Sequence, residues 1–176
     1  MKIAIYGHYF NQEAQQYVED LLSALGKKNA NIYIEERFLE LIKTTFKTDI
    51  NYNTFNNHTD LDDSFDYMFT VGGDGTILRS ITYLRDSNIP VIGVNIGRLG
   101  FLATVNKVRI SEAVENLQNK NYAVKERTLL TINTEPKIEE LEDFNFALNE
   151  ITLSRKNTAS MITVETHLDN EYLTSY

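Results

Sequence analysis

The sequence predicts an α/β protein in which a parallel sheet covered by helices is followed by a smaller β-rich unit. Up to Ala103, short apolar runs alternate with segments whose apolar residues recur at helical spacing. This order is typical of parallel strands joined by helices. After Ala103, one amphipathic segment is followed by strand-like runs with no helical pattern between them. The predicted fold is therefore a Rossmann-like parallel-sheet domain followed by a second, β-rich (α+β) domain.

The elements of the first domain, residues 1–104, follow from local patterns. The opening run KIAIYG is short, apolar and ended by Gly7, which is typical of a buried strand. The next segment has apolar residues at helical spacing and Gly26 near its end, which indicates a helix. The stretch 47–64 is rich in Asn, Asp and Thr and predicts a long loop. In chain order we expect strands at 2–7, 31–36, 65–71 and 90–97, and helices at 11–29, 37–46 and 76–86.

The second domain, residues 105–176, begins with a predicted helix at 108–121. Three strand-like runs follow, at 122–134, 144–156 and 160–176. In the last run apolar and polar residues alternate between Met161 and Leu168, as in a half-buried strand. The chain stops inside this run, and three strands with an open edge make a marginal unit. We therefore expect this domain to be truncated or to need a partner.

Composition excludes several functional classes. The chain has 176 residues, and 17 basic against 25 acidic side chains give a net charge of −8. No basic stripe is present, so binding to nucleic acid or to an anionic membrane surface is not expected. There is no cysteine, which excludes disulfides, thiolate metal sites and a cysteine nucleophile. No signal peptide or membrane-spanning stretch is recognisable, so a cytoplasmic protein is expected.

The stretch TVGGDGT at 70–76 spends three of the eight glycines of the chain between a predicted strand and a predicted helix. Glycines and a helix N-terminus favour binding of a phosphate group. The dinucleotide fingerprint fails because Leu78 stands where its last glycine is needed, and the P-loop fails because no Gly-Lys follows. Asp74 is poorly suited to touch a phosphate but could face a Mg²⁺ ion or a hydroxyl group. That combination indicates a kinase acting on an alcohol; the alternative is a tight connection with Asp74 as a cap.

Three segments together resemble the NAD kinase family: GGDGT at 72–76, NIGRLGFLA at 95–103 and ALNEITLSR at 147–155. Their order and spacing match the family over essentially the whole chain. The resemblance implies ATP- and Mg²⁺-dependent phosphorylation of the 2′-hydroxyl of the adenosine ribose of NAD, giving NADP. It makes Asp74 the catalytic base. The residues that it assigns to nucleotide or NAD binding are Gly73, Asp74, Gly75, Thr76, Arg79, Gly100, Phe101, Leu102, Asn149 and Glu150.

The side-chain chemistry of Asn149 and Glu150 agrees with that assignment. An asparagine amide can pair with adenine N6 and N7, and a carboxylate suits a ribose diol. Taken alone, the pair would be read as an ordinary exposed or bulged site, and Phe101 and Leu102 as core residues. Leu102 stands where relatives often have an aromatic, and the family's next Gly-Asp-Gly motif has no counterpart in this sequence.

Two other functions are compatible with the same residues. A lipid kinase of the diacylglycerol type shares GGDGT, and a nucleotide-binding module without catalysis is a reading from a different class. His8, His58 and His167 are scattered, so no permanent metal site is expected, and the acidic turn at 60–63 is expected to be solvated. The expected ligands are NAD and ATP with Mg²⁺ or another divalent cation. The family resemblance implies a homo-oligomer, a dimer or a tetramer.

Overall fold

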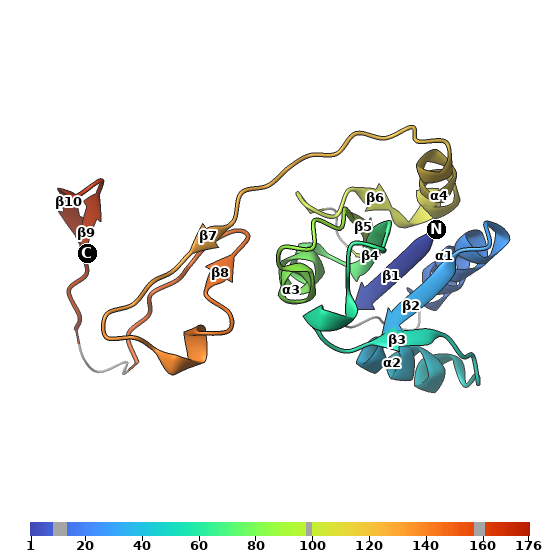
Figure 1. The fold of residues 1–176 in the computed structure, drawn as a ribbon, viewed down its shortest axis with the longest axis horizontal. Coiled ribbons are helices and arrows are strands. Elements are labelled where there is room, and N and C mark those ends of the chain that lie inside the picture. The colour runs from blue at the N-terminus through green and yellow to red at the C-terminus, as the bar shows by residue number, and fades with distance from the viewer. Residues whose placement is uncertain (9–13, 98–99, 157–160) are drawn as a thin grey trace.

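A six-stranded parallel sheet forms the centre of the first part of the chain. The computed structural model describes residues 1–8, 14–97, 100–156 and 161–176. The strands lie in the order β3-β2-β1-β4-β5-β6, and every neighbouring pair is parallel (Figure 1). Their bounds are β1 Lys2–Gly7, β2 Asn31–Glu35, β3 Asn53–Phe55, β4 Tyr67–Gly72, β5 Val91–Asn95 and β6 Val105–Asn106.

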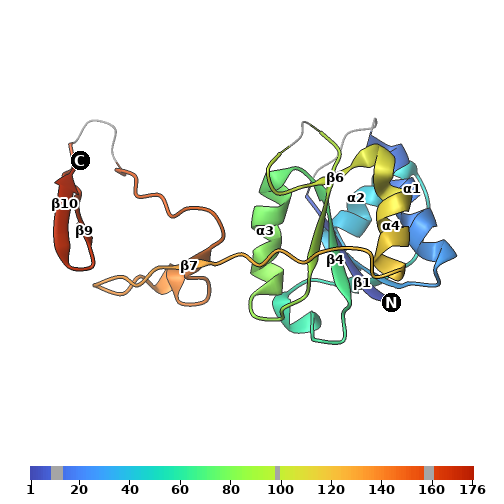
Figure 2. The ribbon, with the colours of Figure 1, turned by 90° about the horizontal axis from the view of Figure 1, so that it is seen from above.

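In the described residues, four α-helices cover the two faces of this sheet. They are α1 Gln15–Lys27, α2 Glu36–Phe46, α3 Asp74–Leu84 and α4 Ile110–Gln118. Figure 2 shows α3 on one side of the sheet and α1, α2 and α4 on the other. Because helices cover both faces, the central strands are apolar on both sides; in β1, the side chains of Ile3, Ala4 and Ile5 are all buried.

Two buried clusters fill the space between the sheet and the helices. The larger joins Ile3 and Ile5 of β1 to the apolar faces of α1, α2 and α4. The smaller lies on the face covered by α3 and includes Ala4, Tyr6 and Met68. Because successive side chains of a strand point to opposite faces of the sheet, β1 contributes Ile3 and Ile5 to one cluster and Ala4 and Tyr6 to the other.

The predicted loop at 47–64 contains one strand that the sequence did not indicate. β3 pairs in parallel with β2 at the edge of the sheet, and it is followed by a short 3-10 turn at His58–Asp60. Only Phe55 of this strand is buried, since Asn53 and Thr54 are exposed. Its side chains therefore lack the apolar alternation by which a strand is recognised.

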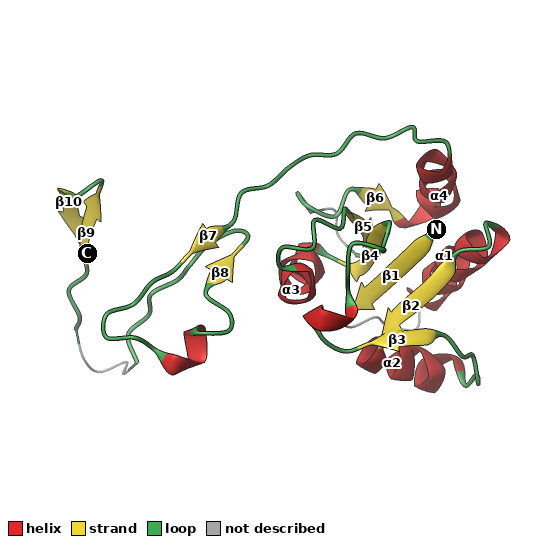
Figure 3. Cartoon of the chain, in the orientation of Figure 1, coloured by secondary structure: helices red, strands yellow, loops and turns green. Residues whose placement is uncertain are grey.

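After α4 the chain leaves the sheet and buries little. β7 Leu130–Thr131 pairs with β8 Phe146–Ala147, and β9 Glu165–Leu168 pairs with β10 Glu171–Ser175, both antiparallel. Figure 3 shows long loops between these short ladders. None of the described residues after Leu117 is buried. In the described part of this region, the three long strands expected are replaced by four short ones, and residues 165–175 of the last run form a hairpin.

The division of the chain at residues 104 and 105 stays a prediction. Two elements that follow this point lie on the first unit: β6 pairs with β5, and α4 contacts α1. The hydroxyl groups of Tyr67 and Tyr122, 2.7 Å apart, join β4 to the start of the exposed segment.

Candidate functional site

The glycine-rich segment lies at the carboxyl edge of the sheet, where the strand order changes direction. β1 and β4 are neighbours, with β2 and β3 on one side of them and β5 and β6 on the other (Figure 1). In open parallel sheets, ligands bind outside the carboxyl ends of the strands at such a switch point. Gly72 ends β4 there, and α3 begins two residues later at Asp74. The topology therefore agrees with the position that the sequence indicated for a site.

The three glycines of this segment meet different surroundings. Gly72 has φ +154°, and a Cβ placed on it would lie 2.0 Å from Oγ1 of Thr76. Apart from the adjacent residues and the backbone of α3 itself, no described atom lies within 4 Å of a Cβ placed on Gly73 or Gly75, and both residues are exposed. The fold therefore requires a glycine at 72, whereas Gly73 and Gly75 leave the backbone at the start of α3 open to a ligand. Free N–H groups at a helix N-terminus favour an anion.

The carboxylate of Asp74 joins the first glycine-rich segment to the second. Its Oδ2 accepts a hydrogen bond from the backbone N–H of Phe101 at 2.7 Å. Its Oδ1 accepts two more, from the N–H groups of Leu102 and Ala103, both at 2.9 Å. These bonds, that of Ala103 first, hold the pKa of Asp74 below its ordinary value. Asp74 is therefore a stable anion whose Oδ2 has room for one further donor.

Gly100 is the residue that permits this contact. A Cβ placed on it would lie 2.2 Å from Oδ1 of Asp74. The following side chain, Phe101, is 93% exposed, so its backbone is fixed while its ring faces solvent. Leu102 is half-buried. Arg98 and Leu99 of the same predicted motif lie outside the described residues.

A second group of side chains lies at the same edge and was missed at the sequence level. Glu35 at the end of β2 is 3% exposed, and its carboxylate accepts from the N–H of Phe38 at 2.8 Å and from the hydroxyl of Tyr83 at 3.2 Å. Burial first, and then the Glu35 charge, raises the pKa of Tyr83 to about 12. The same two causes raise the pKa of Tyr6, whose ring centroid lies 5.1 Å from that of Tyr83. A lone glutamate at the end of a strand gives no signal that it will be buried.

Arg79 lies near this group. It is exposed on α3, and its positive charge opposes the rise in the pKa of the Tyr6 phenol. Arg79 lies one turn after the start of α3, whose first residue is Asp74. Thr76, by contrast, is buried in the first turn of α3, and its N–H donates to the carbonyl of Gly73 at 2.9 Å.

The structure does not bring Asn149 and Glu150 beside Asp74. Both are exposed in the segment after β8, where the Asn149 amide donates to the Glu150 carboxylate. Figure 1 shows β7 and β8 apart from the six-stranded sheet, and Figure 2 shows the same for β7. The membership of this pair in the site stays a prediction.

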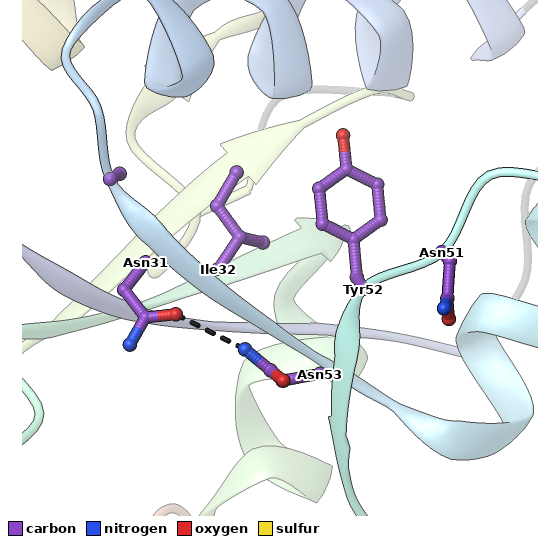
Figure 4. A pocket seen from close by; sticks show the side chains of 6 residues that line it. Asn31, Ile32, Asn51, Tyr52 and Asn53 are labelled. Atoms are coloured by element: carbon purple, nitrogen blue, oxygen red, sulfur yellow. Dashed lines mark hydrogen bonds between the residues drawn. The ribbon is translucent and has the colours of Figure 1, made fainter.

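A shallow pocket lies at the other edge of the sheet. It is lined by Ala30, Asn31, Ile32, Asn51, Tyr52 and Asn53, at the amino ends of β2 and β3. Figure 4 shows the amides of Asn31 and Asn53 turned toward each other, joined by a 3.1 Å hydrogen bond. In a parallel sheet this is the edge away from Asp74, so the pocket is separate from the candidate site.

Two further features of the described residues bear on the site. Within residues 1–8, 14–97, 100–156 and 161–176, no three His, Cys, Asp or Glu side chains gather as metal ligands. None of the helices in these ranges is both long and apolar enough to cross a bilayer.

Comparison with known proteins gives the family. A family model described as the ATP-NAD kinase N-terminal domain matches residues 3–122. The matched range includes both glycine-rich segments and the three hydrogen bonds between them. The chain belongs to the ATP-NAD kinase family.

Two relatives named NAD kinase resemble this chain over its full length. The NAD kinase of Christiangramia forsetii is 48% identical and that of Flavobacterium johnsoniae 46% identical over 176 residues. In both cases the chain spans 60% of the relative's length.

Solved structures of NAD kinases share the fold. A yeast NADH kinase in complex with NADH matches with a TM-score of 0.72 at 20% identity, covering 99% of this chain and 54% of that one. An NAD kinase from Archaeoglobus fulgidus in complex with ATP matches with a TM-score of 0.68 at 22% identity, covering 99% and 57%. The α/β fold predicted from the sequence is confirmed.

Proposed function

We propose that this chain provides the phosphate-binding loop and the catalytic carboxylate of an NAD kinase. The reaction transfers the γ-phosphoryl group of ATP to the 2′-hydroxyl of the adenosine ribose of NAD, giving NADP and ADP. Family membership supports the reaction class, and the relatives named NAD kinase support the acceptor. Because the chain spans 60% of the length of those relatives, the activity is proposed for a protein of the relatives' length that contains these residues.

The observation that carries the proposal is the position of Asp74. It begins α3 between two glycines whose surroundings are open, and its carboxylate is ionised with one acceptor position of Oδ2 left over. A hydroxyl group can donate to that position while phosphate oxygens face the N–H groups at the start of the helix.

The proposed step requires little of the protein beyond this placement. The 2′-oxygen forms the new O–P bond, the bond between the γ-phosphorus and the bridging oxygen breaks, and the electron pair leaves with ADP. The hydroxyl proton passes to Oδ2 of Asp74 and from there to water. Because phosphoryl transfer proceeds through a loose transition state, orientation of the hydroxyl contributes more than strong basicity. A carboxylate with a lowered pKa suits that role.

The remaining ligands follow from the same proposal. We infer that Gly73, Gly75, Thr76 and Arg79 border the phosphates, and that Gly100, Phe101, Leu102, Asn149 and Glu150 border the nucleoside of NAD. Mg²⁺ would enter with ATP, held mainly by phosphate oxygens and water, which is how this ion is usually bound at kinase sites. A cytoplasmic homo-oligomer is part of the same proposal.

The test is an assay of NADP formation. Purified chain is incubated with ATP, Mg²⁺ and NAD, and NADP is measured with an NADP-specific dehydrogenase. Asp74→Asn should lower turnover by about 100-fold or more, the usual contribution of a positioned acid or base. Gly26→Ala in α1, where a Cβ meets no described atom within 4 Å outside the helix backbone and the adjacent residues, is the matched control and should leave turnover unchanged.

The same experiment separates the alternatives. Phosphorylation of diacylglycerol and not of NAD would refute the acceptor and support a lipid kinase. Binding of NAD and ATP without turnover would support a nucleotide-binding module. Repeating the assay with a chain extended to the length of the relatives shows whether the part of their sequence beyond the matched 60% is needed.

A further inference from the structure

We infer that Asp74 has a second, positioning function: its carboxylate fixes the segment 100–103, so that one group holds both the acceptor hydroxyl and the loop that borders it. This inference rests on the proposed function for the role of the loop. The contact itself is a property of the chain without ligand.

The geometry of the carboxylate carries the inference. Three consecutive backbone N–H groups, those of Phe101, Leu102 and Ala103, converge on its two oxygens at 2.7–2.9 Å. A carboxylate has about four acceptor positions, so three are used by the loop and one is left at Oδ2. Bonds from N–H groups to a charged oxygen are among the stronger hydrogen bonds in proteins.

The surroundings of the loop show why it depends on this contact. The segment joins β5 to β6, and Phe101 is 93% exposed, so its side chain contributes little packing. Only Ala103 at its end is fully buried. The segment is therefore held at one end by packing and along its length by the Asp74 carboxylate.

The sequence is fitted to the same contact at Gly100. Any side chain at this position would meet Oδ1, Cγ and Oδ2 of Asp74 within 2.2–2.5 Å. The glycine thus serves the approach of the loop to the carboxylate. This gives a variant, Gly100→Ala, that perturbs the contact without removing the carboxylate.

Hydrogen exchange by NMR on the ligand-free chain tests the contact directly. The amides of residues 101–103 should be protected in the parent chain. Asp74→Asn keeps one side-chain oxygen and replaces the other by an NH₂ donor. Protection should therefore fall about tenfold or more at the backbone N–H that faces this NH₂ group, and so at one or more of the three residues. Gly100→Ala should lower protection at all three. Gly26→Ala serves as the control, and protection of amides in β4 reports that each variant is folded.

Two readouts separate positioning from a purely structural effect. The amide proton shifts of residues 101–103 in the parent should follow one acidic titration with a midpoint below that of an ordinary aspartate, and this titration should vanish in Asp74→Asn. NAD affinity, measured by calorimetry, should fall about tenfold in Gly100→Ala. The double variant should then bind no more weakly than Asp74→Asn alone, because the two changes remove one contact.

The outcomes decide the inference independently of the proposed function. Unchanged protection at 101–103 in both Asp74→Asn and Gly100→Ala overturns it, whatever the protein binds. Additive losses of NAD affinity overturn the positioning function as well. If the parent chain has protected, co-titrating amides but binds no NAD, the contact stands and the proposed function fails for this chain.

Discussion

Gly93 is the position where one added methyl group should disturb both the fold and the candidate site. It lies in β5 opposite Thr70 of β4 and faces α3. A Cβ placed on it would lie 2.5 Å from Cδ1 of Ile77 and 2.7 Å from Cα of Ala103. The Ile77 methyl group can rotate away, but the Ala103 backbone cannot, because its N–H is bound to Asp74.

The magnitude follows from those distances. Ordinary contacts of a Cβ begin near 3.4 Å, so the Ala103 backbone would have to move by about 0.7 Å or the strand would have to shift. Overpacking of this kind costs about 1–3 kcal/mol. For a folded unit of this size, we expect Gly93→Ala to lower Tm by roughly 3–12 °C.

The assay is thermal and urea denaturation followed by far-UV circular dichroism, with Gly26→Ala as the control. Gly26 lies near the end of α1 in open space, so alanine there should leave stability unchanged or raise it by up to about 1 kcal/mol. Hydrogen exchange at Ala103 should also be faster in Gly93→Ala. A free energy of unfolding within about 0.5 kcal/mol of that of the parent would refute this prediction, because the strand and the loop would then accommodate the added methyl group without strain.

Three other predictions concern the carboxyl edge and the buried strand beside it. Glu35→Ala removes the acceptor for the Phe38 N–H and the Tyr83 hydroxyl, and should lower the free energy of unfolding in urea by about 1–3 kcal/mol; no change would exclude a role as a cap. Thr70→Val should raise the free energy of unfolding by about 1 kcal/mol, because the buried Thr70 hydroxyl has no hydrogen-bond partner among the described residues; a loss of stability would contradict this. Folding raises the pKa of Tyr83 from 10.0 to about 12, so the unfolded chain loses this proton at a lower pH than the folded chain does. This contribution to stability is therefore complete below pH 10 and is lost as the pH rises towards 12. Urea midpoints at about pH 9 and about pH 11 should show the fall, and Tyr83→Phe should reduce it.

The sheet was predictable where burial left a simple pattern. β1 and β4 are runs of apolar residues ended by glycine, and their bounds agree closely with the predicted 2–7 and 65–71. β3 was not predictable because its backbone pairs with β2 while two of its three side chains are exposed. Pairing through the backbone has no signature in residue type.

In the C-terminal runs the residue pattern predicted burial that the structure does not have. The alternation up to Leu168 is that of a half-buried strand, yet Leu168 is 64% exposed and Leu173 in the next strand is 59% exposed. Alternation reports which face of a strand is suited to burial, and it does not supply the surface that covers it. β9 and β10 therefore pair only with each other among the described residues.

The candidate site was also predictable only in part. Asp74 could be singled out because an acid among glycines is unusual, and the residue type itself suggests its chemistry. Its partners could not be singled out, because they are the backbone N–H groups of Phe101, Leu102 and Ala103, and almost every residue has such a group. The sequence also left unseen that Glu35 and Tyr83 would meet at the same edge.

Glycines in the two segments have separable physical reasons, and this makes the site open to dissection. Gly72 is needed by its φ of +154° and by Thr76, so alanine there should damage the fold whether or not a ligand binds. Gly100 is needed by the Asp74 carboxylate, so alanine there should release the loop. Nothing in the described chain requires a glycine at Gly73 or Gly75. Alanine at either position should leave the free energy of unfolding near that of the parent, and any loss of nucleotide affinity then measures how closely the ligand approaches the start of α3.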